Sequence, residues 1–408
     1  MANGFLIQGG EVYDGSGGPA LSADVRLQGE KIVEIGPNLA DQGDHTIDAT
    51  GRIVCPGLID LHVHAYGKMG VYSVDPEDIG LRTGVTTMLD FGTAGCLNYG
   101  PFAESVMSNA REDVYALLNI AQYGVQGQPT VEPFIGDLFE IERLHVPSAV
   151  DCIERYPQRI LGTKVRLTAA LARNRIEHER AGFRGALEVA EVTGRSCMVH
   201  HVRSALTPQE VLSQLRAGDV YTHTYNGWEH RPFDESDATP LQATLDARQR
   251  GVIFDVGHGE GSFVWRIAEP ACQQHGFWPD TISTDLHRFN IYGPVYDMPT
   301  TMTKFLQLGL PMQNVIEKST RAPARVMKLD DRIGLLSPGY QADVTMLRLI
   351  DGPFELYDVE QEVRLAPQRL LPVMVFKCGH RYPCSGTFLQ TPEFSRAIES
   401  SAMEPESK

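Results

Sequence analysis

Positive charge is scarce in this sequence, and long apolar segments are missing from it. The 408 residues include 36 Lys and Arg against 52 Asp and Glu, which gives a net charge of -16. No basic stripe interrupts this acidic balance, so a nucleic-acid-binding protein is excluded, because contacts with phosphates need clustered positive charge. No run of about eighteen apolar residues occurs, and the N-terminus has neither a basic nor an apolar signal-peptide region. We therefore expect no membrane segment.

Paired cysteines and the glycine signatures of several enzyme classes are absent as well. The seven cysteines are odd in number and show no Cys-x-x-Cys spacing, which indicates reduced thiols and a cytoplasmic protein. No glycine-rich loop leads into a helix in the way that a phosphate-binding loop requires. No Gly-x-Ser-x-Gly motif occurs either, so nothing indicates a serine-hydrolase elbow.

The pattern of the chain changes twice, which divides it into a central part and two flanks. Residues 1–55 read as short strands separated by glycine and proline turns, and residues 328–390 return to this β pattern. Each flank alone is too short to enclose a core, so we expect both chain ends to form one small discontinuous β-sandwich domain rather than two independent ones. Residues 391–408 form a polar tail, and residues 56–327 form the central domain.

Apolar strands alternate with longer, more polar segments throughout the central domain. The eight candidate strands span Leu58–His64, Val85–Gly92, Val114–Ala121, Ile160–Thr168, Cys197–Val202, Val220–Asn226, Val252–Gly257 and Thr281–His287. Near-continuous apolar strands, each followed by a crossover, are typical of a parallel sheet covered on both faces. Eight of them, in a span close to the usual barrel size of about 250 residues, predict an α/β fold, a (β/α)8 TIM barrel.

Polar residues that can bind metals gather near the ends of five of these strands. In a barrel of this kind the carboxyl ends of all strands meet at one rim, where the reacting groups lie. The side chains concerned are His62, His64, Lys164, His200, His201, His223 and Asp285. His62 and His64 lie on the same face of one strand because side chains alternate along it. One His-x-His pair is weak evidence, but five strands that bring His, Lys or Asp to one rim predict a metal site.

Lys164 is the one cation in this set, and an ammonium group cannot bind a metal cation. Burial in an apolar strand lowers the pKa of a lysine, which makes the neutral amine accessible. Reaction of that amine with carbon dioxide would give a carbamate, whose two oxygens could span two metal ions. The alternative is an ion pair between Lys164 and a barrel carboxylate such as Asp90.

Two stretches resemble the amidohydrolase superfamily. Residues 56–64 (Pro-Gly-Leu-Ile-Asp-Leu-His-Val-His) resemble the entry into its barrel, and residues 336–343 (Leu-Ser-Pro-Gly-Tyr-Gln-Ala-Asp) resemble the return to its β domain. Four further residues fit the superfamily in their strand contexts: Lys164, His200, His223 and Asp285. Within it, the chain is most similar to deacetylase-like, dihydroorotase-related metal-dependent hydrolases. That similarity is carried by residues 222–227, 255–259, 283–287 and 293–305.

The resemblance implies two divalent metal ions, which we expect to be zinc. Each ion would be bound by ligands from more than one strand. The more buried ion would be held by His62, His64 and Asp285, the more exposed ion by His200 and His223, and both by a bridging N6-carboxylysine at Lys164. A metal-bridging hydroxide would attack the substrate, and the aspartate would carry its proton to the leaving group.

The neighbouring histidines 200 and 201 are alternatives for one ligand position. His201 points to the other face of the strand from His200, so the two cannot share one metal ion. The family pattern ends this strand at Val-His, which favours His200 over His201.

Five further polar residues near the strand ends are candidates for substrate binding: Arg166, Arg203, Asn226, His258 and His287. Either arginine could bind a substrate carboxylate bidentately, and a rim salt bridge is the alternative for each. The other three could donate a hydrogen bond to a carbonyl or orient the catalytic aspartate from a second layer.

These observations together predict a binuclear metal-dependent hydrolase of amide or ester bonds. The resemblance implies deacetylation of a small carboxylate-bearing substrate by a homo-oligomeric enzyme. A cyclic-amide hydrolase of dihydroorotase or hydantoinase type is the alternative, and product analysis would separate the two. A non-catalytic barrel that serves as an assembly partner is a more remote alternative, because such a protein should have lost metal ligands that are all present here.

Overall fold

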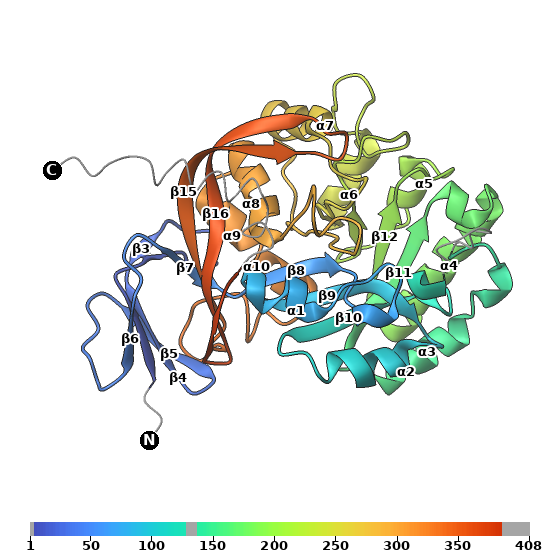
Figure 1. The fold of residues 1–408 in the computed structure, drawn as a ribbon. Coiled ribbons are helices and arrows are strands. Elements are labelled where there is room, and N and C mark those ends of the chain that lie inside the picture. The colour runs from blue at the N-terminus through green and yellow to red at the C-terminus, as the bar shows by residue number, and fades with distance from the viewer. Residues whose placement is uncertain (1–3, 128–136, 386–408) are drawn as a thin grey trace.

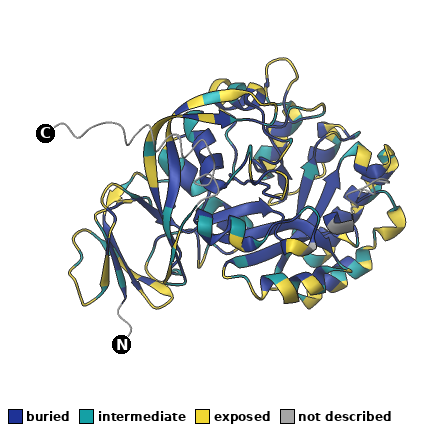
Figure 2. Ribbon diagram, in the orientation of Figure 1, coloured by how far each residue is buried: buried dark blue, intermediate teal, exposed yellow. Residues whose placement is uncertain are grey.

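Seven parallel strands form the central sheet of the computed structural model, which describes residues 4–127 and 137–385. In sheet order they are β8 (Leu58–Val63), β9 (Val85–Gly95), β10 (Asp113–Asn119), β11 (Ile160–Leu167), β12 (Ser196–His201), β13 (Val220–Thr222) and β14 (Ile253–Phe254). Sheet order follows chain order, as expected when a crossover joins each strand to the next. Both β8 and β9 are buried along their whole length (Figure 2), which explains why their sequences are almost continuously apolar.

The eighth predicted strand, Thr281–His287, is not a regular strand. Its residues form single parallel bridges to both edges of the sheet, from Thr281 to Asp255 beyond β14 and from Leu286 to Val63 of β8. The segment therefore lies where an eighth strand would lie, and the sheet curls into a TIM-barrel-like α/β fold. Asp285 interrupts the extended backbone because its φ is +51°, a left-handed conformation that no regular strand contains.

Helices in the crossovers lie outside this sheet (Figure 1). They are α1 (Pro76–Ile79), α2 (Tyr99–Phe102), α3 (Val146–Arg155), α4 (Ile176–Thr193), α5 (Pro208–Leu212), α6 (Gln242–Arg250), α7 (Trp265–Glu269), α8 (Met298–Gln307), α9 (Met312–Lys318) and α10 (Arg321–Val326). The longest, α4, contacts β11 and buries Phe183, Ala186 and Val189. Its opposite face is polar, so the helix packs on the barrel along one apolar stripe.

Two smaller sheets are built from the chain ends, the first from N-terminal residues alone and the second from both ends. One has the order β5-β4-β1-β6 and the other β17-β16-β15-β7-β2-β3. Their strands are β1 (Phe5–Gln8), β2 (Glu11–Val12), β3 (Leu21–Ser22), β4 (Asp24–Gln28), β5 (Lys31–Gly36), β6 (His45–Asp48), β7 (Ile53–Pro56), β15 (Val344–Tyr357), β16 (Val363–Lys377) and β17 (His380–Pro383). Val25 and Ile47 share one apolar cluster with Val344 and Phe376, so both chain ends contribute to the same core.

The hairpin of β15 and β16 is long, and its distal half extends over the barrel (Figure 1). We call residues 351–366 the arm. At its tip, Asp358 accepts a hydrogen bond from the backbone N–H of Trp265 at 2.9 Å, and the Val359 N–H donates to the carbonyl of Phe263 at 3.2 Å. The arm therefore contacts the segment that follows β14, close to the carboxyl rim of the sheet.

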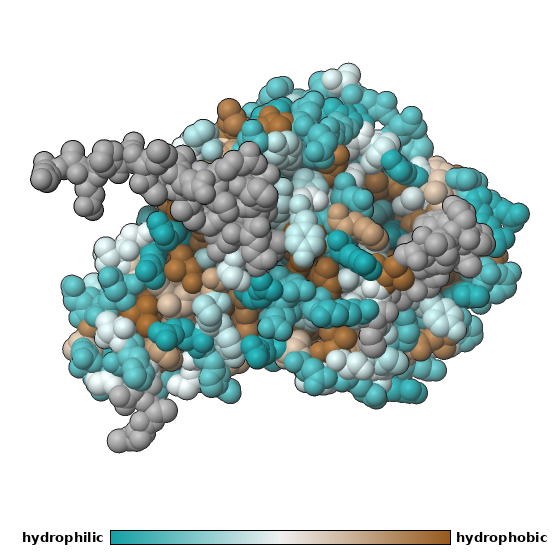
Figure 3. Space-filling model, in the orientation of Figure 1, coloured by the Kyte–Doolittle hydropathy of each residue, from teal (hydrophilic) through white to brown (hydrophobic). Residues whose placement is uncertain are grey.

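Two sequence expectations concern features other than the barrel. Within the described ranges, no helix is long and apolar enough to cross a membrane, and the surface in Figure 3 is largely hydrophilic with scattered apolar side chains. All seven cysteines are free thiols. The predicted polar tail, residues 391–408, and the last residues of the 328–390 segment lie outside the described residues.

A buried ion cluster attaches the chain-end sheet to the barrel. The Lys377 ammonium of β16 donates to Asp113 at 2.6 Å and to Asp343 at 2.8 Å. Asp113 begins β10, so the cluster joins one barrel strand to the sheet that both chain ends build. Lys377 is only 5% exposed, and removal of one partner from such a buried cluster leaves uncompensated charge.

We predict that Lys377→Met lowers the free energy of unfolding by about 3 kcal/mol, because the buried Asp343 carboxylate loses its counter-charge without regaining water. Equilibrium urea unfolding measures the change. The matched control is Arg325→Met, since Arg325 is exposed and its carboxylate partners are 3.7 and 4.0 Å away; we expect at most about 0.5 kcal/mol there. Equal losses in the two variants would contradict the structural role of the Lys377 cluster.

Candidate functional site

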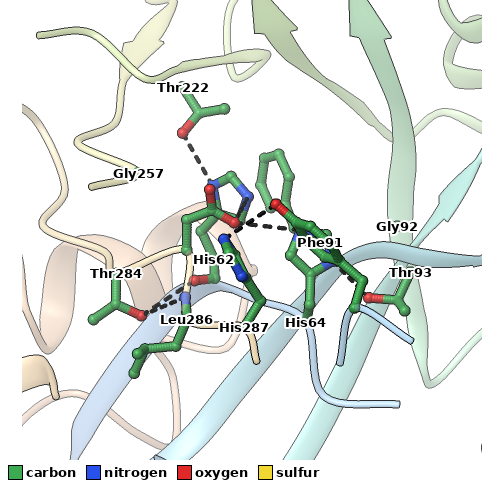
Figure 4. A network of polar contacts seen from close by, with 12 residues as sticks. His62, His64, Phe91, Gly92, Thr93, Thr222, Gly257, Thr284, Leu286 and His287 are labelled. Atoms are coloured by element: carbon green, nitrogen blue, oxygen red, sulfur yellow. Dashed lines mark hydrogen bonds and ion pairs between the residues drawn. The ribbon is translucent and has the colours of Figure 1, made fainter. Parts of the chain in front are cut away.

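Three elements at the carboxyl rim bring four polar side chains to one point, of which Figure 4 shows His62 and His64. His62 lies in β8 and His64 directly after it, His223 follows β13, and Asp285 lies in the segment that bridges the sheet edges. Asp285 Oδ1 is 3.2 Å from His62 Nε2 and 3.3 Å from His64 Nε2, while its Oδ2 is 3.9 Å from His223 Nε2. The ligand atoms of His62, His223 and Asp285 all lie within 4.8 Å of one another, which is the spacing that a shared cation requires.

Three of these atoms are buried and have no hydrogen-bond partner among the residues that the structure describes: His62 Nε2, His223 Nε2 and Asp285 Oδ1. A buried polar atom left unpaired costs roughly 1–3 kcal/mol, so several at one place need an explanation. Two imidazole nitrogens and a carboxylate oxygen are the donor types that divalent transition metals prefer in proteins. The residues present therefore fit a metal ion.

The protonation states of His64, His223 and Asp285 also suit metal binding, whereas the Asp285 carboxylate, against the effect of burial, raises the pKa of His62. Burial lowers the pKa of both His64 and His223 to about 3, so each imidazole is neutral near pH 7 and its Nε2 can offer a lone pair. Burial alone would raise the pKa of Asp285, but the adjacent His62, His64 and His223 hold it well below its usual range. The carboxylate is therefore ionised.

A threonine and an aspartate lie behind His64. His64 Nδ1 is 2.7 Å from the Thr93 hydroxyl, which donates its own proton to Asp90 at 2.6 Å. Because that proton is engaged, the hydroxyl oxygen can only accept from His64 Nδ1–H. The relay therefore fixes the tautomer in which Nε2 is unprotonated and faces Asp285.

A second relay of the same kind lies behind His62. His62 Nδ1 is 3.1 Å from the Thr222 hydroxyl, which donates to Asp255 at 2.7 Å. Asp255 also accepts from the hydroxyls of Thr281 and Ser283 at 2.6 and 2.7 Å, so its position is well determined. The sequence analysis missed these supporting residues, although each is a polar residue within an apolar barrel strand or at its end.

His223 is held in the same way, through a backbone group. Its Nδ1 donates to the carbonyl of Gly257 at 2.6 Å, which again leaves Nε2 unprotonated. His223 and Asp285 both have left-handed backbones, with φ of +63° and +51°. Two asparagine amides hold their carbonyls: Asn226 donates to that of His223 at 3.0 Å, and Asn290 donates to that of Asp285 at 2.7 Å. Such backbone strain is characteristic of functional sites.

Lys164 is fully buried beside this cluster and forms no ion pair with a carboxylate in the part of the chain that the structure describes. Its ammonium donates to the carbonyl of Phe91 at 3.0 Å and lies 4.0 Å from the centre of the Phe91 ring. Asp90, the alternative partner, accepts from Thr93 instead. Burial lowers the pKa of Lys164 to about 7. Gly92, with φ of +79°, leaves room for this side chain, because a Cβ there would lie 2.7 Å from Lys164 Cγ.

The structure separates the two neighbouring histidines of β12. The His200 ring lies 4.3 Å from the His223 ring, measured between centroids, so His200 faces the cluster. His201 points away from it and uses both nitrogens elsewhere, with Tyr221 Oη at 2.8 Å and the Leu206 carbonyl at 3.0 Å. Of the two, only His200 faces the cluster, and its Nε2 is 3.3 Å from the Thr168 hydroxyl.

Three predicted substrate residues are engaged within the protein. Asn226 holds the His223 carbonyl, as described above. His258 Nε2 is 2.6 Å from the buried Lys304 ammonium, and its Nδ1 is 3.0 Å from the Gly259 carbonyl. His287 Nε2 is 3.1 Å from the Tyr72 hydroxyl. These contacts within the protein favour the second of the two roles that the sequence left open.

The two predicted arginines differ in their surroundings. Arg166 is buried and donates to Asp137 through Nε at 3.0 Å and Nη2 at 2.7 Å, so its charge is already compensated. Arg203 is exposed, and its guanidinium carbon lies 3.3 Å from the centre of the Trp228 ring. The structure therefore favours the salt-bridge role for Arg166, whereas Arg203 stacks on an aromatic ring.

Comparisons with known proteins agree with this geometry. The model of the amidohydrolase family matches residues 266–378. A deacetylase of Agrobacterium fabrum is 33% identical over 357 residues, which cover 86% of this chain and 84% of that protein. Among solved structures, an adenine deaminase superposes with a TM-score of 0.84 and 28% identity over 93% of this chain and 100% of its own. A dihydroorotase gives 0.83 and 29% over 96% of this chain and 100% of its own.

We predict that Thr222→Val lowers the affinity for zinc by about 10–100-fold, because the relay no longer fixes the His62 tautomer. Competition with a chromophoric chelator measures the affinity. Thr222→Ser retains the hydroxyl and should bind zinc almost as tightly as the wild type. Thr87→Val is the matched control, since the Thr87 hydroxyl is buried in the same barrel and has no hydrogen-bond partner in the described parts of the chain. An equal loss in Thr222→Val and Thr87→Val would contradict the relay.

Proposed function

Because the chain belongs to the amidohydrolase family and is a metal-dependent hydrolase acting on C–N bonds, we propose that it removes an acetyl group from a small carboxylate-bearing substrate. The observation that carries this proposal is the convergence of three buried, unpaired ligand atoms on one point. The similarity to a deacetylase over most of both chains supports the choice of acetyl group. The acetyl group could be bound through an amide nitrogen or through an ester oxygen, because the same hydrolysis cleaves both bonds.

We assign the metal-binding roles as follows. One ion would be held by His62, His64 and Asp285, a second by His200 and His223, and Lys164, once carboxylated, would be a ligand to both. The neutral His64 and His223, the ionised Asp285 and a buried lysine with no carboxylate partner among the described residues support this assignment. When bound, two divalent cations, which we expect to be zinc, polarise the scissile carbonyl and make water acidic near neutral pH.

Asp285 is the group that moves the proton in this proposal. It is ionised, so it can accept a proton from the attacking water and deliver it to the leaving nitrogen or oxygen. The relays behind His62 and His64 direct the Nε2 atoms of both rings at Asp285, and the low pKa of His64 prevents that imidazole from taking the proton itself. Gly259 contributes by its lack of a side chain, since a Cβ there would lie 2.6 Å from Asp285 Oδ2.

Hydrolysis of a cyclic amide is a second candidate reaction. The similarity to a dihydroorotase over nearly the whole chain favours it, and the same residues could perform it. The two reactions differ in their products, because deacetylation releases acetate whereas ring opening adds water without losing atoms. A non-catalytic role is disfavoured by the full set of candidate ligands.

We also propose that residues 1–55 and 328–390 form one discontinuous β-sandwich domain beside a barrel of residues 56–327. The apolar cluster shared by strands from both chain ends supports this division. The Lys377 cluster then lies at the boundary between the two domains.

We predict about two metal equivalents per chain in protein prepared with zinc and bicarbonate, and one or fewer in Lys164→Ala, because the bridging ligand is lost. Elemental analysis measures the metal content. Carbon-13 NMR of protein prepared with labelled bicarbonate should show a carbamate signal that is missing in Lys164→Ala. Lys318→Ala is the control, as Lys318 is a partly buried lysine away from the site. Full metal content in Lys164→Ala would contradict the bridging role.

We predict that the zinc-loaded enzyme releases acetate from some members of a panel of acetylated amino and hydroxy acids. Asp285→Asn should reduce the turnover number by at least about 100-fold, because the amide cannot accept the proton of the attacking water. An enzymatic acetate assay gives the rate. Ring opening of dihydroorotate or a hydantoin, with no acetate released from any panel member, would favour the cyclic-amide hydrolase instead.

A further inference from the structure

One indole ring joins three loops at the carboxyl rim of the barrel. Arg203 follows β12, Trp228 follows β13, and Gly261 follows β14. The Arg203 guanidinium carbon lies 3.3 Å from the centre of the Trp228 ring, and Trp228 Nε1 donates to the Gly261 carbonyl at 3.0 Å. Because carboxyl ends of barrel strands face the reacting centre, this assembly lies at the mouth of the site.

The indole is also connected to the proposed metal ligands. Asn226 Oδ1 accepts from the Trp228 backbone N–H at 3.0 Å, while its Nδ2 donates to the carbonyl of His223 at 3.0 Å. At the other end, Gly261 lies two residues beyond Gly259, the glycine that borders Asp285. The position of Trp228 is therefore fixed relative to the centre by one side-chain amide and one loop.

The Arg203 charge has no carboxylate partner among the described residues, although the protein is acidic overall. Its backbone is left-handed, with φ of +54°, and its carbonyl accepts from the Ala169 N–H at 2.9 Å. Stacking occupies the face of the guanidinium and leaves the N–H groups at its edge available. Those N–H groups match the geometry of a carboxylate, which they can bind bidentately. By contrast, two N–H groups of Arg166 already donate hydrogen bonds to Asp137.

A negative net charge disfavours the approach of an anionic substrate. The chain carries a charge of -16, which repels small anions at long range. A restrained guanidinium at the mouth offsets this repulsion locally, and the ring reduces the rotamer freedom that a flexible arginine would lose on binding.

We propose that Arg203, held on Trp228, binds the substrate carboxylate and so selects acetylated acids over their neutral analogues. This inference rests on the proposed deacetylase function and specifies which residue determines its substrate class. Arg166 is left with a positioning role in its pair with Asp137.

The test compares a carboxylate substrate with its neutral counterpart. For the acetylated acid that wild-type enzyme hydrolyses fastest, Arg203→Gln should raise KM by about 10–100-fold, while KM for the primary amide of that acid stays within about twofold. Arg203→Lys should restore part of the difference, because it keeps the charge without the planar fork. Trp228→Leu should raise KM for the acid by about fivefold, since the arginine is no longer restrained.

Arg288→Gln is the matched control. Arg288 is exposed at the same rim, just after His287, and has no aromatic partner among the described residues. The Arg288→Gln substitution changes the net charge by the same amount as Arg203→Gln. It should nevertheless leave KM for the acid within about twofold. Equal effects of Arg203→Gln and Arg288→Gln, or equal effects on acid and amide, would overturn the proposal.

Failure of the proposed function gives a different result. If two metal ions bind but no acetylated compound is hydrolysed, the proposed deacetylase function is wrong. The preference for a carboxylate is then measured as a difference in binding affinity instead of KM. Isothermal titration of the zinc-loaded protein with both enantiomers of N-acetylalanine and their primary amides then decides. If Arg203→Gln loses affinity for the acids but not for the amides, the role of Arg203 is supported. If the variant binds the acids as tightly as the wild type does, or if the wild type does not bind them detectably, the proposal is overturned.

Discussion

Desolvation of the ligand atoms is the constraint on which the rest of the site depends. His62 Nε2, His223 Nε2 and Asp285 Oδ1 are buried, and no group of the described chain satisfies them. Leaving such atoms unpaired costs free energy, so the rest of the fold has to hold these side chains in place. The threonine relays do this for His62 and His64, and the Gly257 carbonyl does it for His223.

The same support extends to the backbone. His223 and Asp285 have left-handed conformations that cost free energy in residues other than glycine. Asn226 and Asn290 each donate an amide hydrogen bond to the carbonyl of one of them. Side chain and backbone of these two residues are therefore held by different groups, which gives the site rigidity before a metal ion or substrate arrives.

The sequence was informative where a residue type alone carries the signal. Apolar strands that end in His, Lys or Asp predicted the sheet and the cluster of His62, His64 and Asp285, because strands of a parallel barrel share one reacting rim. The relays were not predictable, since Thr93 and Thr222 reach their aspartates through side-chain directions that strand periodicity does not report. The eighth strand was predicted as regular because the left-handed backbone of Asp285 leaves no mark in residue type. Arg166 and Arg203 looked equivalent in sequence, and only their partners, Asp137 and Trp228, distinguish them.

The arm has a consequence for the order in which the site is completed during synthesis. Lys304 donates to His258 and to the Tyr357 carbonyl at the arm tip, both at 2.6 Å. His258 belongs to the loop whose glycines border His223 and Asp285. Every candidate metal ligand has left the ribosome before residue 357 emerges, yet the loop behind two of them gains its last anchor only then. A nascent chain therefore holds the whole ligand set for some seconds at typical rates of elongation before the loop that orders it is fixed.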